Sequence, residues 1–300
     1  MPDAVAVVGP TATGKSDLGI RLAAELDGEV VNADAMQLYR GMDIGTAKVP
    51  PPQRQNIPHH LLDVLDVSES ASVAAYQRDA RSRLADIRDR GRTPVLVGGS
   101  GLYVRSVVDD LRFPGTDPEL RATLTAEAQQ LGNDTLHRRL ARYDPEAAAS
   151  ILPSNTRRVV RALEVIEITG RPFTANLPVP GPPLHGMRLI GLDQDTARLD
   201  TRVDARVQRM FEAGLVAEVR RLLDRGLRSG PTAARALGYQ QVLAAIDGAG
   251  DFAAAASDTA RATRRFVRKQ RKWFRRDSRI EWFDAGSAHL ADEVLAALWQ

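Results

Sequence analysis

The chain has 300 residues, of which 43% are hydrophobic and 26% charged, a composition typical of a folded protein with one large core or a core and a smaller satellite. The absence of cysteine excludes a disulfide scaffold, a Cys-ligated zinc site, a thiol nucleophile and an iron–sulfur cluster. The net charge of +3 is unevenly distributed. Between Arg261 and Arg279 ten basic residues stand against one acidic residue, so this stretch carries +9 and the remainder −6. It predicts a polyanionic partner held at one place.

No targeting or membrane segment is evident in the sequence. The first residues lack the basic and long apolar regions of a signal peptide, and no apolar stretch approaches the roughly 20 residues that cross a bilayer. We therefore expect a cytoplasmic protein that does not bind membranes.

The first predicted elements alternate between strand and helix. Short apolar runs at 4–9, 29–32 and 93–98 predict buried strands, and the spacing of apolar residues predicts helices at 17–26 and 72–90. This alternation indicates a parallel sheet with right-handed crossovers.

The pattern changes in the middle of the chain. Residues 117–170 show only helical segments, 174–186 form a proline-rich loop, and 187–192 predict a return to the sheet. We therefore predict an α/β fold with a P-loop NTPase-like parallel sheet core flanked by helices and an all-helical insertion domain. The core would comprise 1–112 and 187–300, and the insertion 113–186.

The last third is mostly helical. Residues 197–225 predict one long helix, 261–276 predict a basic helix, and 279–283 predict a final strand. Four arginines line one face of the long helix, at positions Arg198, Arg202, Arg206 and Arg209.

A glycine-rich loop joins the first predicted strand to the first predicted helix. Its sequence fits G-x-x-x-x-G-K-[ST], in which backbone N–H groups and the lysine surround phosphate oxygens. The predicted phosphate-binding residues are Gly9, Pro10, Thr11, Ala12, Thr13, Gly14, Lys15 and Ser16. The Ser16 hydroxyl is placed to hold Mg²⁺, which is the expected cofactor. The alternative, a glycine-rich turn with a surface lysine, is disfavoured by the flanking strand and helix.

The other parts of a nucleotide site are missing. An NTPase or kinase usually has an acidic residue at the end of a neighbouring strand, which holds Mg²⁺ through water. Here Val97 is followed by Gly98-Gly99-Ser100-Gly101, and no N-K-x-D motif for guanine is present. The loop predicts phosphate binding and leaves the identity of the phosphate compound open.

Asp34 is the carboxylate nearest to this loop in the predicted sheet, because it follows the second strand. It is a candidate general base or metal partner. The alternative is an aspartate that caps a strand-to-turn junction.

Nine segments resemble one known family. They are GPTATGKS (9–16), DAMQLYRGMDIGTAK (34–48), IPHHLLDVLDVSES (57–70), VGGSGLYVRSVVDDL (97–111), DPELR (117–121), SNTRRVVRALEV (154–165), RVDARVQRM (202–210), ARALGYQQ (234–241) and TRRFVRKQRKWFRR (263–276). In this order they are similar to the bacterial tRNA dimethylallyltransferases. The resemblance implies transfer of the dimethylallyl group of dimethylallyl diphosphate to N6 of the adenosine at tRNA position 37, beside the anticodon.

The resemblance also implies roles for individual residues. Asp34 would be the general base, and Thr11, Lys15 and Arg206 would act on the departing diphosphate, which the whole loop 9–16 would bind. Arg206 is chosen from the four arginines of the long helix, for which the alternative is an exposed basic face. Two other functions remain open at this stage: a small-molecule or nucleotide kinase, and a non-catalytic RNA-binding protein that uses the loop as a switch.

The implied partner is the anticodon stem-loop of tRNA, bound by a monomer. The expected tRNA-binding residues are Asp34, Ala35, Met36, Gln37, Ser100, Arg121, Arg157, Arg158, Arg161, Arg235, Tyr239, Gln240, Arg268, Arg271 and Arg275. We expect the +9 segment to repel itself without a polyanion, which disfavours a merely solvated helix, and we expect replacement of Arg268, Arg271 and Arg275 to weaken the salt dependence of tRNA binding. The pair His59-His60 lacks a third ligand nearby, so it predicts capping or hydrogen bonding rather than zinc.

Overall fold

A computed structural model describes residues 2–174, 181–248 and 251–299 of the chain. The chain divides into two compact units. Unit 1 comprises Met1–Asp109 and Pro182–Gln300, and unit 2 comprises Asp110–Gly181. None of the helices in the described residues is both long and apolar enough to cross a membrane.

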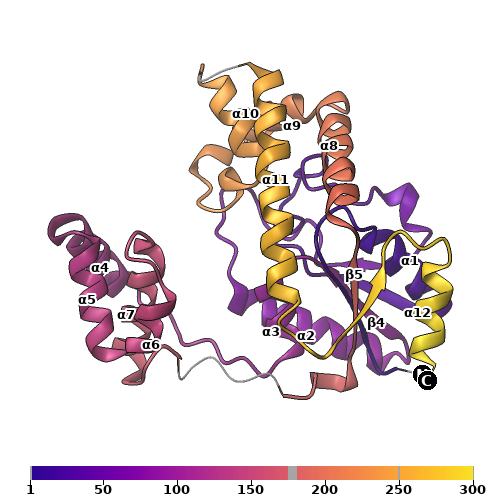
Figure 1. Cartoon of the computed structure of the whole chain (residues 1–300), viewed down its shortest axis with the longest axis horizontal. Coiled ribbons are helices and arrows are strands. Elements are labelled where there is room, and N and C mark those ends of the chain that lie inside the picture. Colours follow the sequence, from indigo (N-terminus) through magenta and orange to yellow (C-terminus); the bar gives the residue numbers. More distant parts are fainter. Residues whose placement is uncertain (1, 175–180, 249–250, 300) are drawn as a thin grey trace. The chain divides into compact units, whose positions relative to one another are not determined.

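Unit 1 is built on a parallel sheet, which confirms the predicted α/β class (Figure 1). The strands lie in the order β3-β2-β4-β1-β5-β6, and every neighbouring pair is parallel. They are β1 (Val5–Val8), β2 (Gly28–Asn32), β3 (His59–His60), β4 (Thr93–Gly98), β5 (Arg188–Asp193) and β6 (Ile280–Asp284). The two-residue strand β3 was not predicted, because its histidines carry no apolar strand signal.

Helices cover both faces of this sheet because its central strands are apolar on both sides. On one face lie α2 (Val73–Asp89) and α3 (Gly101–Val108), which share a core with Ala6 and Val8 of β1. On the other lie α1 (Lys15–Glu25) and α12 (Leu290–Leu298), which pack on Val5 and Val7.

A second helical layer of unit 1 has its own apolar cluster. The layer contains α8 (Thr196–Glu212), α9 (Leu215–Leu223), α10 (Tyr239–Ile246) and α11 (Phe252–Phe274). The described part of the unit also has short 3-10 helices. These are η1 (Pro51–Arg54), η3 (Leu184–Gly186), η4 (Leu227–Ser229) and η5 (Ala233–Arg235). The prediction of one helix over 197–225 was wrong, since the chain breaks at Gly214, whose φ of +99° lies in the left-handed region.

The described part of unit 2 is a bundle of four helices around a separate core. They are α4 (Pro118–Leu131), α5 (Asn133–Tyr143), α6 (Pro145–Ser150) and α7 (Thr156–Thr169). Asp117 and Asp144 begin α4 and α6, since their carboxylates accept backbone N–H groups of the first turn. The predicted loop 174–186 lies partly outside the described residues.

The parallel strand order determines which loops meet. The phosphate loop follows β1, the Asp34 segment follows β2, and Gly98–Ser100 follow β4 between them. All three therefore lie at the carboxyl edge of the sheet, where open α/β sheets bind ligands.

Candidate active site

The loop after β1 has the geometry of a phosphate cradle. Gly14 has a φ of +82° immediately before α1, a conformation that glycine adopts without strain, so the loop turns directly into the helix. The Thr13 hydroxyl donates to the Pro10 carbonyl at 2.9 Å inside the loop. Lys15 Nζ donates to the same carbonyl, and Thr11, Lys15 and Ser16 line a pocket.

Asp34 is fixed at the same pocket by its neighbours. The Asn32 side chain accepts the Asp34 N–H and donates to the Asp34 carbonyl, both at 3.0 Å. The carboxylate accepts the Met36 N–H at 2.9 Å through Oδ1, and no hydrogen bond within the described residues occupies Oδ2. Ser100 Oγ accepts the Ala35 N–H at 3.1 Å, which joins the Asp34 segment to the turn after β4. The two segments thus present Asp34 in a defined position.

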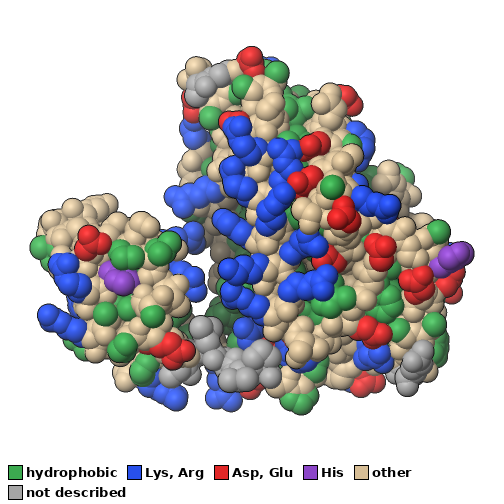
Figure 2. All heavy atoms as spheres, in the orientation of Figure 1, with side chains coloured by type: hydrophobic (Ala, Val, Ile, Leu, Met, Phe, Trp, Pro, Cys, Tyr) green, Lys and Arg blue, Asp and Glu red, His purple; other side chains and the backbone are tan. Residues whose placement is uncertain are grey.

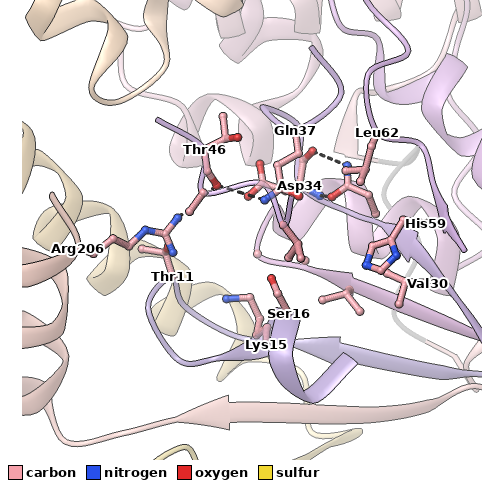
Figure 3. Close-up of a pocket in the computed structure, with 16 residues that line it drawn as sticks. Thr11, Lys15, Ser16, Val30, Asp34, Gln37, Thr46, His59, Leu62 and Arg206 are labelled. Atoms are coloured by element: carbon pink, nitrogen blue, oxygen red, sulfur yellow. Dashed lines mark hydrogen bonds between the residues drawn. The ribbon is translucent and has the colours of Figure 1, made fainter. Parts of the chain in front are cut away.

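The pocket brings together one carboxylate and two cations. It contains about 610 Å³ of space, partly open to solvent, and Lys15, Ser16, Asp34 and Arg206 converge on it from three elements (Figure 3). Its other lining residues are Thr11, Val30, Asn32, Gln37, Thr46, Ala47, Val49, His59, Leu62, Val97, Gly98 and Gly99. Burial and the nearby Arg206 lower the pKa of Lys15 to about 7, although Asp34 acts in the opposite direction. Cationic groups held so close favour an anionic ligand.

Arg206 is the arginine of α8 that reaches this pocket. Its Nη2 donates to the Thr46 carbonyl at 3.3 Å, and Gln37 Nε2 donates to the same carbonyl at 3.2 Å. Burial lowers the pKa of Arg206 and Asp34 raises it; an arginine nevertheless stays protonated in proteins. The periodicity of α8 could show an arginine-rich face but not which of its members enters a pocket.

Glu218 of α9 holds the segment that carries Thr46. Its buried carboxylate accepts the backbone N–H groups of Asp43, Ile44 and Gly45 at 3.2, 2.8 and 3.2 Å. It also accepts the Tyr239 hydroxyl at 2.5 Å. Sequence reasoning missed Glu218, because nothing local distinguishes it from a surface glutamate.

Tyr239 is therefore a structural residue. Its side chain is 0% exposed, so the prediction that it contacts tRNA was wrong. A Cβ at Gly45 would lie 2.4 Å from its ring, which explains the glycine in that segment. Burial, with Glu218 beside it, raises the pKa of Tyr239 far above its ordinary value and keeps the hydroxyl protonated as a donor.

Known proteins share this sequence and fold. The model of the IPP transferase family matches residues 37–277. A tRNA dimethylallyltransferase of Saccharopolyspora erythraea is 64% identical over 99% of this chain and 96% of its own, and one of Salinispora arenicola is 61% identical over 97% and 85%. The chain belongs to the tRNA dimethylallyltransferase family. A tRNA isopentenylpyrophosphate transferase of Bacillus halodurans, of known crystal structure, is 39% identical with a TM-score of 0.73, over 100% of this chain and 96% of that one.

The family assignment decides between the functions left open by the sequence. The chain is an enzyme of the tRNA dimethylallyltransferase family, a prenyltransferase that modifies tRNA, and the kinase alternative is not favoured. A phosphate loop without the usual acidic neighbour fits this family, since no phosphoryl group is transferred.

The basic segment lies on α11 and on the turn that follows it, which holds Arg275 and Arg276, and it presents two kinds of cation. Arg268 pairs with Asp200 of α8 at 2.7 Å, and Arg271 and Arg275 pair with Asp193 at 3.0 and 2.7 Å. Arg264 pairs with Asp204. Four, three and four residues apart, these arginines form one row on the helix, which we call the paired row. The expected self-repulsion therefore does not hold for this row, because acidic residues of the body neutralise it.

A second row of α11 carries cations without such partners. Arg265, Lys269, Lys272 and Arg276 repeat the same spacing one residue further on, are exposed, and make no ion pair within the described part of the chain. We call them the open row. Figure 2 shows Lys and Arg side chains gathered along α11, with acidic side chains on the side of α8.

The predicted arginines of unit 2 also differ in what they contact. Arg121 and Arg161 both bind the fully buried Glu164, each at 2.9 Å, so their guanidinium groups stabilise the bundle. Arg157 and Arg158 of α7 are exposed. In unit 1, Arg235 and Gln240 are exposed as well. Asp34 and Gln37 line the pocket, and Ser100 is joined to this segment by its bond to the Ala35 N–H.

Both members of the histidine pair make hydrogen-bond contacts with neighbouring groups. His59 Nδ1 contacts the Ile57 carbonyl at 2.8 Å, and His60 Nε2 contacts Glu29 at 2.6 Å. Among the described residues, no three His, Cys, Asp or Glu side chains converge to hold a metal ion.

Proposed function

We propose that this enzyme transfers the dimethylallyl group of dimethylallyl diphosphate to N6 of the adenosine at tRNA position 37, next to the anticodon, and releases diphosphate. The observation that carries the proposal is the pocket in which Asp34 faces Lys15, Arg206 and the hydroxyls of Thr11 and Ser16. A diphosphate needs the cations, and an amine that loses a proton needs the carboxylate.

The cations and the loop would act on the leaving group. As the allylic C1–O bond breaks, both electrons go to the diphosphate, whose growing negative charge the loop N–H groups, Lys15 and Arg206 would stabilise. Electrostatic stabilisation of this kind is usually the largest contribution to catalysis. The negative diphosphate would also oppose the lowering of the Lys15 pKa and keep its ammonium charged. We place Thr11 at the leaving oxygen, because it lines the pocket at the same loop.

Asp34 would act on the nucleophile. The lone pair of N6 forms a bond to C1, and the proton that N6 then loses goes to the Asp34 carboxylate. Positioned general bases typically contribute about 10²–10⁴-fold. Oδ2, which has no partner within the described residues, is the oxygen we assign to this proton.

The donors present fit a Mg²⁺ ion that is held mainly by its substrate. The pocket offers the hydroxyl of Ser16 and the carboxylate of Asp34 rather than a cage of carboxylates, and Mg²⁺ commonly takes most of its ligands from phosphates and water. Ser16 would hold the ion, which when bound neutralises charge on the departing diphosphate.

The anticodon stem-loop would bind through its phosphates and present a single base. To reach N6, the adenosine must leave its stack and enter the pocket beside 34–37 and Ser100. We propose that the open row of α11, with Arg235 and Gln240, contacts the RNA of the stem-loop, and that the exposed Arg157 and Arg158 contribute from unit 2. The paired row, which includes Arg268, Arg271 and Arg275, would hold α11 on the body instead.

Labelled dimethylallyl diphosphate, Mg²⁺ and an unmodified stem-loop test the reaction directly. Label should enter RNA with adenosine at position 37 and not an otherwise identical RNA with guanosine there. Asp34→Asn should keep dimethylallyl diphosphate binding and lower the transfer rate by about 10²-fold or more. Transfer to the guanosine RNA would refute the proposed acceptor, and an unchanged rate for Asp34→Asn would remove Asp34 as the base.

A further inference from the structure

Gln270 joins the basic helix to two loops of the active site. It lies on the buried side of α11, 6% exposed, in the middle of the run Arg268-Lys269-Gln270-Arg271-Lys272. Its Oε1 accepts the Thr11 N–H at 2.9 Å, and its Nε2 donates to the Gly99 carbonyl at 2.9 Å. One uncharged side chain thus satisfies a donor of the phosphate loop and an acceptor of the turn after β4.

The turn after β4 is shaped to receive α11 at this point. A Cβ at Gly99 would lie 2.5 Å from Gln270 Nε2, and one at Gly101 would lie 2.2 Å from the indole nitrogen of Trp273. Residues 270 and 273 are almost one helical turn apart, so the helix contacts the turn through two successive side chains. The same turn carries Ser100, whose hydroxyl accepts the Ala35 N–H beside Asp34.

The hydrogen bond from Thr11 to Gln270 determines the orientation of Thr11 in the phosphate loop. With its backbone N–H directed at Gln270, Thr11 still lines the pocket in which we place the diphosphate. A primary amide is the side-chain chemistry that can accept from the one backbone group and donate to the other while remaining uncharged. A carboxylate would lose the donor to Gly99 and add negative charge next to an anion site, and an aliphatic side chain would leave both groups without a partner.

We propose that Gln270 is a positioning residue for the transfer reaction, which holds Thr11 in the orientation that acts on the leaving group. This proposal rests on the proposed function, since it assigns Gln270 an effect only through Thr11. It also means that α11 has two tasks on opposite sides: its open row faces the RNA, and Gln270 holds the phosphate loop.

A double-mutant cycle on Gln270 and Thr11 tests this link. Single-turnover transfer would be measured at saturating dimethylallyl diphosphate and stem-loop for Thr11→Ala, Gln270→Met and the double variant. We expect Gln270→Met to slow transfer by about 10-fold and Thr11→Ala by about 100-fold, with the double variant within about twofold of Thr11→Ala alone. The dissociation constant of the stem-loop should stay within about twofold in all three, because neither residue belongs to the open row.

Controls separate positioning from a general loss of structure. Gln208→Met removes an exposed glutamine of α8 whose side chain bonds Glu212 and no other group of the described residues, and should transfer at the wild-type rate. If Gln270→Met unfolds, Gln270→Asn keeps the amide one methylene shorter and enters the same cycle. Rate losses that multiply in the double variant would overturn the link while leaving the proposed function intact. A wild-type rate for Thr11→Ala would refute both the link and the proposed role of Thr11.

Discussion

At the scale of single residues, Arg206 has the largest expected effect on the pocket. It enters from α8 and donates to the Thr46 carbonyl, and its charge contributes to the low pKa of Lys15. Two cations so close repel each other until an anion lies between them, so each should gain from binding of the diphosphate.

We expect Arg206→Gln to lower kcat/KM for dimethylallyl diphosphate by about 10²–10³-fold, because a charged donor to the leaving group is lost. Arg209→Gln is the matched control, since Arg209 is an exposed arginine of the same helix. Steady-state kinetics at saturating stem-loop would measure both. Equal losses for the two variants would show that general positive charge, rather than the position of Arg206, is responsible.

A second residue-scale prediction concerns Glu29 at the start of β2. Hydrogen bonds from Arg90 and His60 lower the pKa of this buried carboxyl from 4.5 to about 2, although burial acts in the opposite direction. A lowered pKa stabilises the fold above pH 4.5, and this contribution, roughly 3 kcal/mol, is lost as the pH falls toward 2.

Urea unfolding between pH 2 and 6 would measure this effect. The free energy of unfolding of the wild type should fall more steeply from pH 4.5 to 2 than that of Glu29→Gln, whose amide does not titrate there. Parallel pH profiles would contradict the role of Glu29. Glu281→Gln is the control, because Glu281 is an exposed carboxylate whose ion-pair partner in the described part of the chain is Arg188.

At the scale of elements, the two rows of α11 differ in what they contact. The paired row contacts acidic residues at β5 and α8, while the open row has no protein partner within the described residues. Acidic residues of the body therefore neutralise the paired row. Of the two rows, the open row alone keeps cations within the described residues that are free to bind phosphates.

Matched double variants on one turn of α11 distinguish the rows. Arg265→Gln with Lys269→Gln should reduce the slope of log Kd for the stem-loop against log salt by about 1.5, the contribution of two phosphate contacts. Arg264→Gln with Arg268→Gln removes the same net charge and should change the slope by less than about 0.5. A larger change in slope for Arg264→Gln with Arg268→Gln than for Arg265→Gln with Lys269→Gln would assign RNA binding to the paired row, as the sequence first suggested.

Local sequence signals predicted the sheet and the position of the pocket, but not the long-range contacts around them. The apolar runs of β1, β2 and β4 and the spacing of the phosphate loop are local signals, so the edge that unites Lys15, Ser16 and Asp34 could be inferred. The choice of row on α11, the burial of Tyr239 and the bonds of Gln270 depend on partners up to 259 residues away in the chain. No local pattern carries that information, although an uncharged glutamine among four cations is a signal for a buried contact.

At the scale of the whole molecule, the two units have separate cores. Leu140 lies in the cluster of unit 2 and Leu84 in a cluster of unit 1, and both are 0% exposed. Cores that share no residues are expected to open as separate cooperative units.

Leu140→Ala and Leu84→Ala form a reciprocal pair that tests this expectation. Each should cost about 2–5 kcal/mol, because a buried leucine leaves a cavity. Hydrogen exchange measured by mass spectrometry should show lost protection in α4 to α7 for the first variant and in the sheet for the second. Loss of protection throughout the chain in either case would indicate a single cooperative unit.

The two rows of α11 have a consequence for how the partners meet. Because one row is neutralised and the other is not, the electric field around the helix is strongest on one side rather than uniform around it. If the open row binds RNA as proposed, an approaching stem-loop would experience a torque as well as an attraction, which would turn its stem before the first contact forms. Association would then be accelerated for the productive orientation in particular.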